Sequence, residues 1–206
     1  KNAVAAAYVA QTLGIPDRII RNVTLAFRGN EHRLELVRSI NIKTKSHSNV
    51  LKNVRMRFYN DSASTNPQTT IAAIKAFPNV PKILIAGGQD KGLDYRPLAR
   101  TLKNSRTELV ILIGENKKKI HRAIKNSGVP IKFVSNLKTA VQTAYQFAKK
   151  LTTNYPARLR MDEVQAGGQL PTTILFSPGA ASFDQFQNYA DRGKKFKTLV
   201  QKLTRK

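Results

Sequence analysis

The sequence predicts a Rossmann-like α/β fold, in which a mostly parallel sheet is covered by helices on both faces. Short apolar segments alternate with amphipathic helical segments along most of the chain. The strand candidates are continuous apolar runs, such as "KILIA" (82–86), "ELVILIG" (108–114) and "TTILF" (172–176). Runs of this kind are typical of parallel strands that are buried on both faces.

The elements follow one another in a regular order. Helices are expected at 2–13 and 16–27, separated by Gly14-Ile15-Pro16. The elements expected after them are a strand at 54–60, a helix at 66–77 with Pro67 at its first position, a strand at 82–86, a helix at 95–102 with Asp94 as a candidate cap, a strand at 108–114, a basic helix at 116–126, a strand at 131–134, a helix at 137–151, a strand at 172–176 and a helix at 183–203.

Two polar stretches, 41–53 and 153–171, interrupt this alternation. We interpret both as polar loops and expect them to be mobile insertions at the surface.

The composition limits the partners of the chain. It holds 36 Lys and Arg against 12 Asp and Glu, and its net charge of +24 is spread along the chain. This balance favours anionic partners such as nucleotides, nucleic acid or acidic metabolites; solvated basic faces in a generally basic proteome are an equal alternative. The absence of Cys excludes disulfides and thiolate metal sites. No apolar run reaches the length of a membrane span.

Three unusual loops follow predicted strands. They are "NDSAST" (60–65), "GGQDKG" (87–92) and "SPGAAS" (177–182). In open α/β sheets, ligands bind beyond the carboxyl ends of the strands, where backbone N–H groups and helix N-termini favour an anion. The small residues of the last loop are expected to leave room for such a ligand.

The residues around this last loop also have structural interpretations. Ser182 and Gln185 have the S-x-x-Q spacing of a capping box, which by itself explains both residue types. Asp184 would lie in the first turn of the same helix, where a carboxylate interacts favourably with the helix dipole.

The other candidates have structural interpretations too. Lys91 can be a solvated loop lysine, and Asp61 can cap a turn. Arg33 can pair with Glu31 or Glu35 at the surface.

Common catalytic signatures are absent from the sequence. It contains no G-x-x-x-x-G-K-[ST] loop for a triphosphate and no G-x-S-x-G nucleophile elbow. Its three histidines do not have metal-ligand spacing, so no metal site is predicted.

Five segments together carry a family resemblance. In chain order they are "KNAVAAAYVAQTLGI", "FRGNEHRLE", "RFYNDSASTNPQTTIAAI", "ILIAGGQDKGLDYRPLA" and "ILFSPGAASFDQFQNYADRGKKF". They resemble the C-terminal part of the Mur ligases. The last two resemble the branch of that family that adds D-glutamate to UDP-N-acetylmuramoyl-L-alanine in peptidoglycan synthesis.

The resemblance implies a domain organisation and a reaction. Residues 1–29 would be the last helices of a central ATPase domain, and residues 30–206 a C-terminal Rossmann-like domain that binds the amino acid. ATP and Mg²⁺ would be held mainly by the central domain. In the reaction that the resemblance implies, ATP would phosphorylate the terminal carboxylate of the substrate, the amine of D-glutamate would attack the acyl phosphate, and phosphate would leave.

The same resemblance implies a place and a state for the chain. It would act in the cytoplasm, without a membrane, in cell-wall synthesis and thereby in cell shape and division. The chain begins without Met and within a helical pattern, so we expect a fragment. Without a P-loop, this fragment alone is expected to be inactive as a ligase.

The resemblance also implies site residues and marks departures. The residues implied for D-glutamate are Lys91, Thr65, Ser182, Phe183 and Tyr189, and those implied for the nucleotide are Arg33 and Asp61. No catalytic residue is expected within the chain. The asparagine with which the family meets the nucleotide is Ala5 here, the histidine that leads its helix is Lys1, and the lysine usual in the family's "NDSKAT" is Ala63.

Two alternative functions remain open at this point. The net charge of +24 supports a basic α/β module that binds nucleic acid, although the sequence lacks aromatic residues interleaved with basic ones. Ala5 and Ala63 support a degenerate, non-catalytic remnant of the ligase. Nonspecific binding to polyanions is expected under each hypothesis.

Overall fold

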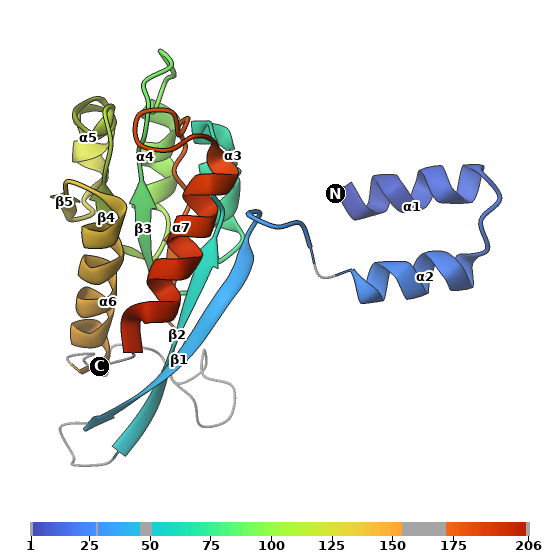
Figure 1. Ribbon diagram of the computed structural model, residues 1–206, viewed down its shortest axis with the longest axis horizontal. Coiled ribbons are helices and arrows are strands. Elements are labelled where there is room, and N and C mark those ends of the chain that lie inside the picture. Colours follow the sequence, from blue (N-terminus) through green and yellow to red (C-terminus); the bar gives the residue numbers. More distant parts are fainter. Residues whose placement is uncertain (1, 28, 46–50, 154–171, 205–206) are drawn as a thin grey trace. The chain divides into compact units, whose positions relative to one another are not determined.

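The computed structural model describes residues 2–27, 29–45, 51–153 and 172–204 (Figure 1). The helices and strands of these residues are α1 (Asn2–Thr12), α2 (Asp17–Ala26), β1 (Glu35–Lys45), β2 (Leu51–Asn60), α3 (Pro67–Lys75), β3 (Lys82–Ala86), α4 (Arg96–Lys103), β4 (Thr107–Leu112), α5 (Lys117–Ile124), β5 (Ile131–Phe133), α6 (Leu137–Thr153), β6 (Thr172–Phe176) and α7 (Tyr189–Gln201). Short 3₁₀ turns follow α5 at Lys125–Ser127 and α7 at Lys202–Thr204.

The strands form one six-stranded sheet in the order β1-β2-β6-β3-β4-β5. All neighbouring pairs are parallel except β1 and β2, which are antiparallel. The mostly parallel sheet predicted from the sequence is therefore confirmed. Because β6 lies between β2 and β3, the segments that follow these three strands leave the sheet side by side.

Helices cover both faces of the sheet, as expected (Figure 1). On one face α6 and α7 pack on the strands, and the ring of Phe196 stacks on that of Phe176 with centroids 4.6 Å apart. On the other face Ile74 of α3, Leu98 of α4 and Ile120 of α5 are buried in a second apolar cluster. The central strands β3 and β6 are buried along their whole length because both of their faces are covered.

Strand β1 was not predicted, and the expected insertion at 41–53 is partly wrong. Residues 41–45 continue β1, and residues 51–53 begin β2. Strand β1 lies at the edge of the sheet and packs only one face on the core. Its sequence therefore lacks the continuous apolar run by which the central strands were recognised. Ile40 is buried, whereas Leu36 is 52% exposed. Residues 46–50, and 154–171 of the second expected insertion, lie outside the described residues.

The last helix begins later than predicted. We expected it to start at 183, but α7 starts at Tyr189, and the Asn188 side chain caps it by accepting the N–H of Asp191 at 2.9 Å. Residues 183–185 form a turn instead. The Asp184 carboxylate accepts the N–H of Glu115 at 3.1 Å. It therefore binds the loop after β4 and does not lie in the first turn of a helix, as was expected.

The chain divides into two compact units, Lys1–Glu31 and His32–Lys206. The first consists of α1 and α2, which confirms the two expected helices, and its apolar side chains, such as Tyr8, Leu13 and Phe27, are exposed. That this unit is the end of a central ATPase domain stays a prediction. Among the described residues, no helix is both long and apolar enough to cross a membrane.

Candidate functional site

Three loops meet at the carboxyl edge of the sheet. They are residues 60–65 after β2, 87–92 after β3 and 177–182 after β6, and they carry most of the candidate residues. The loop after β6 lies in the middle because β6 lies between the other two strands. This is the edge at which open α/β sheets bind their ligands.

The loops after β2 and β6 are joined by hydrogen bonds. The N–H of Asp61 donates to the carbonyl of Phe176 at 2.8 Å, and the N–H of Gly179 donates to the carbonyl of Ser64 at 2.9 Å. The Ser177 hydroxyl donates to the Asp61 carboxylate at 2.7 Å. The relative position of the two loops is therefore fixed by backbone and side-chain contacts.

The loops after β3 and β6 are joined as closely. The N–H of Gly87 donates to the carbonyl of Pro178 at 2.8 Å, and the N–H of Gln89 donates to that of Ala181 at 2.9 Å. A Cβ at Gly88 would lie 2.2 Å from the Ala181 carbonyl oxygen, so a larger residue cannot replace this glycine without moving a loop. The small residues of both loops allow this close approach.

Lys91 and Phe183 come together at the rim of these loops. The ammonium nitrogen of Lys91 lies 5.8 Å from the centroid of the Phe183 ring, and 61% of Phe183 is exposed. Lys91 itself is exposed to solvent. An exposed lysine over an aromatic face keeps its donors available to an anion.

Ser182 is buried beside this pair and does not cap a helix. Its carbonyl accepts the N–H groups of Gln185 at 3.2 Å and Phe186 at 2.9 Å, which closes the turn at 183–185. The capping box expected from Ser182 and Gln185 is wrong because α7 starts only at Tyr189.

The other two residues implied for D-glutamate, Thr65 and Tyr189, lie in the loop after β2 and at the start of α7. Thr65 is half-buried at the end of the loop after β2. Tyr189 is 47% exposed at the start of α7, and its carbonyl accepts the Ser62 hydroxyl at 2.7 Å. The assignment of these residues to a ligand stays a prediction, but each lies on or directly beside the joined loops.

Asp61 and Arg33, the two residues implied for the nucleotide, differ in exposure. Asp61 is buried, and its carboxylate accepts the N–H of Leu34 and the hydroxyls of Ser64 and Ser177. Burial raises the pKa of Asp61 above its usual value. The hydrogen bonds from the two hydroxyls and the charge of Arg33 lower the pKa, but they offset the effect of burial only in part. Arg33 is exposed. Of the two acidic residues expected as its surface partner, Glu35 pairs with Lys197 at 3.0 Å, and a pairing of Arg33 with Glu31 stays a prediction.

Arg192 is a residue of this region that the sequence interpretation missed. It is completely buried on α7, and its guanidinium donates to the carbonyl oxygens of Ala180 and Ala181 and to Ser62. The Arg192 side chain therefore lies against the small residues of the loop after β6, and the room expected there for a ligand stays a prediction. A signal was present in the sequence: Arg192, Phe196 and Val200 recur at helical spacing, which places an arginine on the buried stripe of α7.

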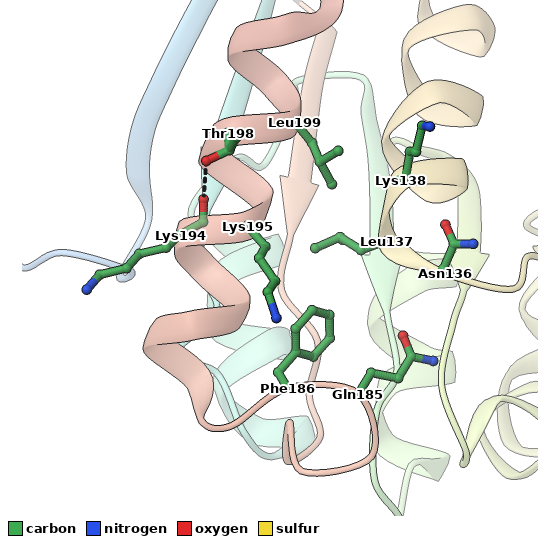
Figure 2. Close-up of a pocket in the computed structure, with 9 residues that line it drawn as sticks. All are labelled: Asn136, Leu137, Lys138, Gln185, Phe186, Lys194, Lys195, Thr198 and Leu199. Carbon is green, nitrogen blue, oxygen red and sulfur yellow. Dashed lines mark hydrogen bonds between the residues drawn. The ribbon is translucent and has the colours of Figure 1, made fainter.

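A separate hollow of about 560 Å³ lies between α6 and α7. Figure 2 shows its lining residues, which are Asn136, Leu137, Lys138, Gln185, Phe186, Lys194, Lys195, Thr198 and Leu199. Lys195 reaches over the Phe186 ring, with 5.2 Å between its nitrogen and the ring centroid, and it also pairs with Asp191. None of the residues predicted for D-glutamate or nucleotide lines this hollow.

Comparison with known proteins identifies the family of this α/β domain. The family model described as "Mur ligase, glutamate ligase domain" matches residues 48–153. The chain belongs to the Mur ligase family.

Curated relatives extend this match along the whole chain. A UDP-N-acetylmuramoylalanine–D-glutamate ligase from a Thermoanaerobacter species is 35% identical over 100% of this chain. Ligases of the same name from Aquifex aeolicus and Pelodictyon phaeoclathratiforme are 34% and 37% identical over 97% and 98% of it. The chain spans only 38%, 40% and 36% of the lengths of these three relatives.

A solved structure supports the fold. The crystal structure of the UDP-N-acetylmuramate-alanine ligase from Thermotoga maritima is similar with a TM-score of 0.56 at 16% identity. The match covers 97% of this chain and 37% of that protein. The chain thus shares its fold with a Mur ligase to which its sequence is only distantly similar.

Proposed function

We propose that this chain supplies the D-glutamate-binding part of a ligase that joins D-glutamate to UDP-N-acetylmuramoyl-L-alanine in peptidoglycan synthesis. The observation that carries the proposal is the joining of the three loops with Lys91, Thr65 and Ser182 at one edge of the sheet. The printed names of the relatives, which match along the whole chain, support the same reaction.

The chemistry of D-glutamate suits this edge. It carries two carboxylates, and the exposed ammonium of Lys91 can donate to one of them in a charge-assisted hydrogen bond. The hydroxyls of Thr65 and Ser182 add neutral donors, and the Phe183 ring beside Lys91 covers the carbon chain. The task of these residues is to hold D-glutamate so that its amine meets the activated carboxyl group of the other substrate.

The proposal assigns ATP and Mg²⁺ mainly to the part of a family-length ligase that lies outside this chain. Of the two residues implied for the nucleotide, Arg33 is exposed and can meet an anionic group. The carboxylate oxygens of Asp61 are already occupied by donors from this domain, which suits a role in shaping the loop. A cytoplasmic location and the UDP-linked substrate belong to the same proposal.

Titration calorimetry of the chain with D-glutamate tests the proposal. We expect D-glutamate to bind and Lys91→Ala to weaken the affinity about tenfold or more, because one charge-assisted hydrogen bond contributes about 1.5–3 kcal/mol. Lys91→Arg should restore it only in part, since a planar guanidinium replaces a compact ammonium.

Lys103→Ala is the matched control, because Lys103 is an exposed lysine at the end of α4. It should leave the affinity unchanged. Thermal melts of the variants check that the fold survives in each. If the Lys91→Ala variant binds D-glutamate as tightly as the wild-type chain, Lys91 is a solvated loop lysine and does not contact the ligand.

A further inference from the structure

Arg192 lies where the loops of the candidate site converge. Its Nε donates to the Ser62 hydroxyl at 3.0 Å and its Nη2 to the Ser62 carbonyl at 2.8 Å. Its Nη1 donates to the carbonyl oxygens of Ala180 at 3.0 Å and Ala181 at 3.1 Å. One side chain thus joins the loop after β2 to the loop after β6.

The third loop passes close to the same guanidinium. A Cβ at Gly88 would lie 3.2 Å from Nη1 of Arg192, so a side chain at this position of the loop after β3 would meet this nitrogen. The Ala181 carbonyl, which accepts from Arg192, also accepts the N–H of Gln89. The Ser62 hydroxyl in turn donates to the Tyr189 carbonyl, which extends the network to the start of α7.

The charge of Arg192 is not neutralised by a direct partner. Its acceptors are one hydroxyl and three carbonyl oxygens, all of them neutral, and within the described part of the chain no carboxylate forms an ion pair with it. Burial lowers the pKa of Arg192 to about 10, with the nearby Asp184 acting in the opposite direction, so the group is still charged at neutral pH. A buried cation of this kind is stabilised by any anion that binds nearby.

We propose that Arg192 is the positioning residue of the D-glutamate site, holding the three loops at the spacing that the two carboxylates require and adding positive charge beneath them. The inference rests on the proposed function. It predicts a need for arginine at this place. A lysine would retain the charge, but its donors all lie on one compact ammonium nitrogen. The contacts of Arg192 use three nitrogens of a planar fork that spans the two loops, which a lysine cannot reproduce.

Arg192→Lys in the 206-residue chain tests this, with Arg38→Lys as the matched control. Arg38 also donates to two backbone carbonyl oxygens, those of Val200 and Gln201, but these lie at the C-terminal end of α7, away from the three loops. By calorimetry we expect Arg192→Lys to weaken D-glutamate binding about tenfold or more, as for loss of a charge-assisted hydrogen bond. Arg38→Lys should leave the affinity within about twofold of the wild-type value.

Amide hydrogen exchange supplies a readout of the loops themselves. The N–H groups of Gly87, Gln89 and Gly179 each donate from one loop to another. We expect their exchange to become about tenfold faster or more in Arg192→Lys and to stay unchanged in Arg38→Lys.

Ser62→Ala is the second variant, for the case that Arg192→Lys does not fold. It removes one acceptor of Arg192 and the link to Tyr189, and it should weaken D-glutamate binding about threefold or more. A wild-type chain that binds no D-glutamate would overturn the proposed function and this inference with it. If the wild-type chain binds and the folded variants bind equally well, the inference alone is overturned.

Discussion

Asp61 connects segments that lie far apart in the sequence. Its buried carboxylate accepts the N–H of Leu34, the hydroxyl of Ser64 in its own loop and that of Ser177 in the loop after β6. The sequence marked this residue as a candidate, but neither of its expected roles required burial. The contacts make it part of the framework on which the exposed residues of the site rest.

Replacing Asp61 by Ala should therefore lower the stability of the domain. Three donors lose their acceptor, and a buried donor without a partner costs about 1–3 kcal/mol. Urea unfolding measures this loss. Asp90→Ala is the control because Asp90 pairs with Lys119 at the surface, and it should change the free energy of unfolding by less than about 1 kcal/mol. Equal unfolding midpoints for the two variants would contradict the role given to Asp61.

Candidate residues could be chosen from the sequence more easily than their environments. Motif resemblance selects Lys91, Ser182 and Phe183, and the structure places Lys91 over the Phe183 ring, while their role toward a ligand stays a prediction. The contacts of Arg192 could not be predicted in the same way. Its acceptor Ser62 lies 130 positions away in the sequence, so the contact depends on the order of the strands.

At the scale of elements, the parallel core was predictable and its borders were not. Strands β3 and β6 are covered on both faces, so their sequences are continuously apolar and easily recognised. Strand β1 needs apolar residues on one face only and was missed. The start of α7 depends on the contact of Asp184 with the Glu115 N–H and on the Asn188 cap, which periodicity does not reveal.

Strand β3 begins with a buried lysine, Lys82, which should make the stability of the domain depend on pH. Lys82 is completely buried, and its ammonium has no hydrogen-bond partner among the described residues. Burial lowers its pKa to about 8, and Arg106 acts in the same direction. The pKa of the folded state thus lies below that of the unfolded chain. Charging Lys82 therefore opposes folding fully below about pH 8, and this penalty is lost as the pH rises toward 10.5.

Lys82→Met should stabilise the domain by about 1–3 kcal/mol near neutral pH, because the variant buries no charge. The gain should shrink between about pH 8 and about pH 10, where the wild-type lysine becomes neutral. Urea unfolding across this range measures the difference. Lys103→Met, at an exposed position of α4, should show no such pH dependence. A gain that is constant with pH would mean that Lys82 does not titrate in this range.

At the scale of the whole molecule, the dominant property is the net charge of +24. We expect RNA to bind at low salt through counterion release alone. If about six phosphates are neutralised, the affinity should fall about 10³-fold between about 50 mM and about 200 mM salt. Fluorescence anisotropy with two RNAs of unrelated sequence measures both the salt slope and any preference. Nanomolar, sequence-selective binding at about 150 mM salt would favour the nucleic-acid module over the ligase.

The hydrogen bonds between the three loops also have a thermodynamic consequence. The entropy lost in ordering these loops is part of the folding equilibrium, since the contacts among Gly87, Pro178, Ala181 and Gln89 exist without a ligand. Under the proposed function, affinity for a small dicarboxylate and resistance to unfolding then depend on the same contacts. Substitutions selected for a more stable fold at this edge of the sheet would tend to tighten binding, which would reverse the usual opposition between stability and activity.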